Sequence, residues 1–141
     1  MESEDDISSI LFNNDLVEEI PKSIEKSLKS MGLKEKIRVA IFSDITSKNT
    51  YGKTWLIIAG ELLLVYNPEV SSDPEVRISL SDIKEIEIRK YVGNNSFIVK
   101  TQKGELELIR FTNTLRPKFE GLKKRLEMFF DLSWKPPTKE I

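Results

Sequence analysis

The chain ends in a stretch whose apolar positions follow a helical period. Between Thr114 and Phe130 they recur at steps of four, three, four and three. The positions are Leu115, Phe119, Leu122, Leu126 and Phe129. Because residues three and four apart share one face of an α-helix, they form a single apolar stripe. The spacing predicts an amphipathic helix over about 114–130, whose stripe must be covered by the rest of the fold.

Seven short segments with strand character lie ahead of that helix, between residues 37 and 111, and turn residues separate them. In the first segment Ile37, Val39 and Ile41 alternate with their neighbours, as in a strand. Gly60-Glu61 separates two apolar runs and is typical of a tight hairpin. A helix is also predicted over about 21–31, since Pro21 suits a first helical turn and Gly32 the position just past the end.

This order of elements predicts a mainly β fold. We expect a seven-stranded antiparallel sandwich or small barrel, closed by the C-terminal amphipathic helix and preceded by the short helix. At 141 residues the chain is long enough for one domain, which we place at 14–132. Residues 1–13 are acidic and predict a solvated tail, and residues 133–141 contain two prolines and predict a linker.

Composition narrows the chemistry sharply. The sequence contains no histidine and no cysteine. This removes Ser-His-Asp and Cys-His catalysis, imidazole and thiolate metal sites, and disulfides. The net charge of −1 predicts no long-range attraction to nucleic acid. No apolar run is long enough to span a bilayer, so we expect a cytoplasmic domain. We also expect this chain to carry no cofactor and no metal.

Cations gather on the polar face of the predicted closing helix. They are Arg116, Lys118, Lys123, Lys124 and Arg125, and within the helix only Glu120 and Glu127 oppose them. One interpretation is contact with anionic lipid or an acidic partner. The other is a solvated helix face, balanced by the acidic N-terminus. Trp134, in the linker, is a further candidate contact, since a lone indole there either docks on the domain or sits at a membrane surface.

Paired carboxylates occur along the strands but do not indicate catalysis. Glu85 and Glu87 share one face of a predicted strand, and so do Glu105 and Glu107. General acid–base catalysis needs carboxylates that converge in a pocket with separated pKa values. Alternation with apolar residues explains these pairs as solvent-facing. We therefore predict no enzyme activity for this chain.

Six short stretches of the sequence carry a resemblance to a known family. The stretches are Ile20-Pro21 through Leu28 to Gly32, Ser43-Asp44, Tyr51-Gly52-Lys53-Thr54-Trp55-Leu56, Leu63-Leu64-Val65-Tyr66, Tyr91-Val92-Gly93-Asn94, and Glu107 through Asn113. They resemble the cytoplasmic pleckstrin-homology-like (PH-like) region that precedes the first transmembrane helix of some bacterial ABC exporters. The similarity covers about residues 20–131, which is most of the chain. No Gly-x-x-x-x-Gly-Lys-[Ser/Thr] phosphate loop is present.

The resemblance implies a non-catalytic accessory domain that serves in docking, assembly or regulation of an ABC-type exporter at the inner face of the cell membrane. Its partner would be the rest of the transporter, and a dimeric parent would make it part of a homodimer. Weak contact with an anionic membrane surface would accompany this role. The alternative is a stand-alone PH-like module that binds a peptide or an anionic lipid surface.

Overall fold

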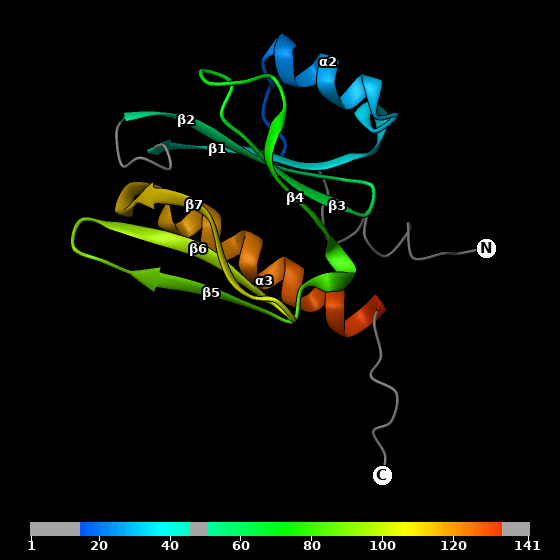
Figure 1. Ribbon diagram of the computed structural model, residues 1–141. Coiled ribbons are helices and arrows are strands. Elements are labelled where there is room, and N and C mark those ends of the chain that lie inside the picture. The colour runs from blue at the N-terminus through cyan, green and yellow to red at the C-terminus, as the bar shows by residue number, and fades with distance from the viewer. Residues whose placement is uncertain (1–14, 46–50, 134–141) are drawn as a thin grey trace.

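Seven antiparallel strands form one sheet in the computed structural model, which describes residues 15–45 and 51–133 (Figure 1). The strands are β1 Ile37–Ile45, β2 Tyr51–Ala59, β3 Leu62–Tyr66, β4 Pro74–Ser79, β5 Glu85–Lys90, β6 Asn94–Thr101 and β7 Gly104–Thr112. The predicted mainly β class and the number of strands are confirmed. The tail over 1–13, the linker from residue 134 onward and the candidate Trp134 lie outside the described residues.

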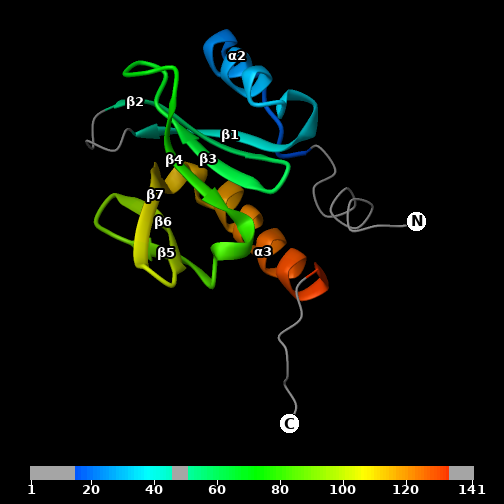
Figure 2. The same cartoon turned by 45° about the vertical axis from the view of Figure 1, so that its right-hand side comes forward.

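The sheet is open, so the expected closed barrel is wrong. Its strand order is β4-β3-β2-β1-β7-β6-β5, which leaves β4 and β5 as edges. Among the described residues, the N-terminal half (β1–β4) joins the C-terminal half (β5–β7) through one pair of strand residues, Ile45 with Arg110. The two halves then diverge, and helix side chains rather than strand pairing fill the space between them (Figure 2).

The C-terminal helix α3, Arg116–Ser133, fills that space. It follows a short 3₁₀ turn over Asn113–Leu115. The predicted stripe faces inward: Phe119, Leu122 and Leu126 are fully buried in one core with residues from both halves of the sheet. The ring of Phe119 stacks on that of Phe111 in β7, with centroids 4.2 Å apart. The interpretation of the closing helix as the plug of the core is therefore confirmed.

The short helix α2, Lys22–Ser30, covers the opposite, outer face of the N-terminal half (Figure 1). Its buried Ile24 and Leu28 pack in a second core with side chains of β1, β2 and β3. The Tyr66 hydroxyl of β3 lies 2.8 Å from the Ser27 hydroxyl of α2 and forms a hydrogen bond with it. Strands β2 and β3 are therefore buried on both faces, which explains why their sequences are continuous apolar runs rather than alternating ones.

The turn between β2 and β3 has the geometry that its sequence predicts. Ala59 pairs with Leu62, so the turn holds only two residues. Gly60 adopts φ +61°, a conformation that glycine reaches without a Cβ penalty. Trp55 is 3% exposed, as expected for a core residue, and its ring contacts that of Phe42. Its indole N–H has no hydrogen-bond acceptor among the described residues.

Candidate functional site

Two of the candidate cations on α3 are paired within the helix. Arg116 Nε lies 2.6 Å from Glu120, and Lys123 Nζ lies 2.9 Å from Glu127. Both pairs have the i, i+4 spacing that places side chains side by side on a helix surface. Arg116 also donates from Nη1 to the buried Asn95 at 3.2 Å, which ties the start of α3 to β6.

Two further cations of α3 are paired with the N-terminal segment. Lys118 Nζ lies 2.5 Å from Glu18, and Arg125 donates two hydrogen bonds to the Asp15 carboxylate, both 2.5 Å long. Backbone hydrogen bonds from Ala40 to Leu16 and from Glu18 to Ala40 hold this segment along β1. The fold thus brings carboxylates about a hundred residues away in sequence to α3.

These pairs change the charge that α3 presents. The five cations now face four carboxylates, and Lys124 is the one for which the described residues supply no carboxylate. Hydrogen bonds from Arg125 lower the pKa of Asp15 below its ordinary value of 3.8, which keeps the carboxylate charged. Of the two interpretations of this helix face, the pairing favours the balanced, solvated one. Exposed ion pairs of this kind add little stability.

The paired carboxylates of β5 and β7 belong to an ion-pair ladder on the outer face of the C-terminal half. Arg89 binds Glu87 at 2.9 Å and Glu105 at 3.0 Å. Hydrogen bonds from Arg89 lower the pKa of Glu87. Partial burial raises the pKa of Glu107, but hydrogen bonds led by that of Arg110 outweigh it and the net shift is downward. A general acid at neutral pH needs the opposite direction.

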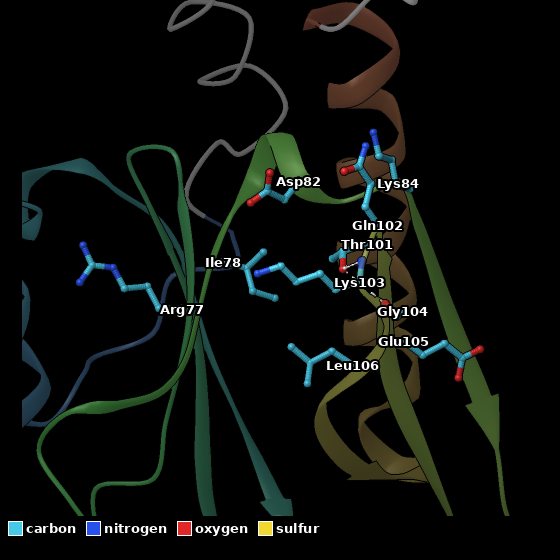
Figure 3. A pocket seen from close by; sticks show the side chains of 10 residues that line it. All are labelled: Arg77, Ile78, Asp82, Lys84, Thr101, Gln102, Lys103, Gly104, Glu105 and Leu106. Carbon is cyan, nitrogen blue, oxygen red and sulfur yellow. Dashed lines mark hydrogen bonds between the residues drawn. The ribbon is translucent and has the colours of Figure 1, made fainter.

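A cavity of about 440 Å³ lies between β4 and the turn that joins β6 to β7 (Figure 3). Ile78 of β4 faces Leu106 of β7 across it, and the Lys103 side chain extends between them, whereas Arg77 and Glu105 point away. Leu106 is 39% exposed. The Thr101 hydroxyl accepts a 3.1 Å hydrogen bond from the Lys103 backbone and shapes the turn. Two apolar side chains beside one ammonium group suit contact with another surface.

A second groove, of about 540 Å³, lies between the edge strand β5 and α3. Ile86 and Ile88 line it from the strand, and Arg116, Lys123 and Lys124 line it from the helix. Since β5 pairs only with β6, the backbone groups along its other edge have no strand partner among the described residues. Three of the five predicted contact residues of α3 therefore border one groove, beside an open sheet edge.

A third basic surface was missed by the sequence reasoning. Lys22, Lys26 and Lys29 are exposed on one side of α2, whose apolar side packs on the sheet. Their spacing of four and three residues was the available signal, since it places all three on one helix face.

Within residues 15–45 and 51–133 no three acidic, histidine or cysteine side chains gather as a metal site. In the same part of the chain no helix combines the length and the hydrophobicity that crossing a membrane requires. Comparison of the sequence with protein-family models and with curated proteins found no match. Identification of the chain therefore rests on its residues and its fold.

Proposed function

We propose that this chain is a PH-like docking module, and more particularly a non-catalytic accessory domain of an ABC-type exporter. The observation that carries the proposal is the order and placement of the elements. A short helix, seven antiparallel strands in two diverging halves and a closing helix follow one another. The stripe of the closing helix enters the space between the halves. Because the core is filled by the helix, the sheet edges, the turns and the surface grooves are the parts of the domain available for binding a partner.

The sequence stretches that resemble the exporter region support the narrower part of the proposal. Trp55 and Tyr66, from two of these stretches, lie in the core between α2 and the sheet. The Gly93 turn, from a third stretch, carries Val92, which is 99% exposed. The stretches thus supply both core and surface positions of the same domain. In this role the domain lies at the inner face of the membrane and contacts the rest of the transporter, where a dimeric parent would bring two copies together.

The reading frame that encodes this chain tests the proposal directly. We expect codons for a six-helix membrane region and a phosphate-loop ATPase to follow codon 141. A stop codon at that point would overturn the exporter proposal and leave the docking-module proposal standing.

A deletion in the parent then tests the accessory role. Removal of residues 15–133 should leave the ATPase machinery able to hydrolyse ATP in detergent, because the domain supplies no catalytic group. It should lower the yield of assembled transporter or change the stimulation of ATPase by substrate. If assembly and stimulation both stay at the wild-type level, the docking or regulatory role is wrong.

A second candidate function is a stand-alone module that binds an extended peptide. The observation that favours it is the open edge of β5 beside α3, since a peptide can add to such an edge as a further strand. The charged residues Glu85, Glu87 and Lys90 on this strand also fit the simpler role of protecting an edge from aggregation. Ile86→Pro, which prevents regular pairing, would abolish peptide binding if the edge were the site.

A further inference from the structure

The exposed side of α2 carries a cluster of cations that form no ion pair with a carboxylate within residues 15–45 and 51–133. A hydrogen bond from Lys34 lowers the pKa of Glu25, and the charges of Lys22 and Lys29 contribute to this shift. Lys22, Lys26 and Lys29 are exposed and stand at i, i+4 and i+7. None of the three has a salt-bridge partner among the described residues. Glu25 on the same helix is engaged by Lys34, with 2.7 Å between Nζ and the carboxylate. In α3, by contrast, four of five cations are paired, two of them within the helix and two through the tertiary structure.

Hydroxyl groups and the neighbouring loop complete this surface. A wide, shallow cavity of about 880 Å³ lies between α2 and the loop that joins β3 to β4. Four lysines, four serines, Glu25 and Asp73 line it, so cations exceed carboxylates by two. Ser23 and Ser72 place hydroxyl donors among the ammonium groups, whereas the Ser30 hydroxyl donates to the Ser27 carbonyl at 2.8 Å. Ammonium and hydroxyl donors together are suited to phosphate oxygens.

An exposed apolar side chain stands on the same loop. Val70 is 67% exposed. Its backbone N–H donates to the Asn67 carbonyl at 2.9 Å, and the Ser71 N–H donates to the same oxygen at 3.1 Å. These bonds close a turn in the β3–β4 loop, and this loop lies at the end of the molecule where α2 lies (Figure 1). Cations and an exposed apolar side chain on neighbouring elements suit a lipid interface, where headgroups are anionic and the region beneath is apolar.

We propose that α2 and the β3–β4 loop form a docking surface for the phosphate headgroups of an anionic membrane, which we call the α2 surface (Lys22, Lys26, Lys29 and Val70). The lysines supply long-range attraction, and Val70 enters the interface at contact. At 0.1 M salt the Debye length is about 10 Å, so charges farther than this from the membrane are largely screened. The net charge of −1 of the whole chain therefore does not prevent attraction between the lysines and the membrane. The inference does not rest on the exporter proposal, because a stand-alone module would present the same surface.

Cosedimentation of the full chain with vesicles tests the proposal. Two kinds of vesicle serve as probes. The neutral vesicles contain phosphatidylcholine alone, and the anionic vesicles contain phosphatidylcholine with about a third phosphatidylserine. We expect binding to the anionic vesicles at 0.1 M salt, its loss above about 0.3 M, and none to the neutral ones. If the wild-type chain does not cosediment with anionic vesicles at low salt, the proposal is refuted. An acidic protein surface would then be the more suitable partner of the lysines.

Two triple variants with the same change in net charge locate the surface. Lys22→Gln, Lys26→Gln and Lys29→Gln remove the α2 cations, and Lys118→Gln, Lys123→Gln and Lys124→Gln remove three from α3. Each unpaired lysine near an anionic surface contributes up to about fivefold in partitioning, so the α2 variant should lose about tenfold or more. The α3 variant should lose about twofold or less, because two of its three lysines are paired and α3 packs on the opposite side of the N-terminal half of the sheet from α2. Equal losses, or a larger loss in the α3 variant, would refute the α2 surface.

The variant Val70→Ser separates the contribution that apolar insertion makes to vesicle binding from the contribution of the lysine charges. The side chain makes no contribution to either core, so the variant should fold with the wild-type far-ultraviolet circular dichroism spectrum. We expect a two- to fivefold weaker partitioning and an unchanged salt dependence, as the loss of about 1 kcal/mol of apolar burial would give. Unchanged partitioning would remove Val70 from the surface and, together with equal losses in the triple variants, would overturn the proposal as a whole.

Discussion

Truncation of Leu122 tests the central claim about this fold, that α3 plugs the space between the two halves of the sheet. Leu122 is 0% exposed and lies between Phe119 and Leu126 on the buried side of α3. Leu122→Ala removes the transfer free energy of the lost methyl groups and leaves a cavity, which together cost roughly 2–5 kcal/mol at buried sites. The exact value depends on how far the surroundings collapse.

The surroundings of Leu122 are rigid, which places the expected loss in the upper part of that range. Phe119 stacks on Phe111 with an interplanar angle of 13°, and its ring centroid lies 5.9 Å from that of Phe97. These rings come from α3, β7 and β6, so a shift of the helix toward the cavity would separate all three. We therefore expect Leu122→Ala to lower the free energy of unfolding by about 3–5 kcal/mol.

Urea denaturation followed by tryptophan fluorescence measures this loss. With a slope of about 2 kcal/mol per molar urea, the transition midpoint should fall by roughly 1.5–2.5 M. The matched control is Lys123→Ala, one residue away on the exposed side of the same helix. It breaks only an exposed pair with Glu127 and should cost less than about 0.5 kcal/mol. Small and equal losses in the two variants would mean that α3 lies on the surface and that the fold is misdescribed.

Three further predictions address the ties between elements and the chemistry of the chain. The folded-state pKa of Asp15 is lowered by hydrogen bonds from Arg125, so this pair stabilises the fold above about pH 4 and the stabilisation disappears as pH falls below the ordinary value of 3.8. Asp15→Asn should therefore be less stable than wild type at pH 6, by a difference that shrinks as pH falls below 3.8, and a pH-independent difference in thermal midpoint would contradict this. Tyr66→Phe should cost about 1 kcal/mol, because the variant loses its hydrogen bond to Ser27; an additive Ser27→Ala, Tyr66→Phe double variant would show that the bond contributes nothing. The chain should show no saturable ATP binding by calorimetry at physiological salt, since its sequence has no phosphate loop, and such binding would overturn the non-catalytic proposal.

The sequence patterns were most informative where structure depends on near neighbours. The stripe from Phe119 to Phe129 predicted which side of α3 is buried, because helical periodicity is a local property. Gly60-Glu61 predicted the hairpin for the same reason. The start of the closing helix involves a contact with a residue distant in sequence. Thr112 makes no capping hydrogen bond, and its hydroxyl donates instead to Asp44, a residue of β1.

The candidate site depended on contacts that no local pattern contains. Arg125 and Asp15 are 110 residues apart, and Lys118 and Glu18 are 100 apart, yet each pair is in contact. Counting the cations of α3 in the sequence overestimated its net positive charge. The carboxylates of Asp15 and Glu18 lie beside α3 only because the N-terminal segment pairs with β1. The same limitation hid the α2 surface, whose lysines stand out only once the other cations are seen to be paired.

The class of the fold, the positions of its helices and turns, and the lack of histidine and cysteine chemistry could all be predicted from composition and from periods of two and 3.6 residues. The open sheet, the burial of β2 and β3 on both faces, and the long-range ion pairs of α3 could not. The physical reason is that side-chain burial and ion pairing depend on distances in space, and these distances are set when α2 and α3 pack on opposite sides of the N-terminal half of the sheet.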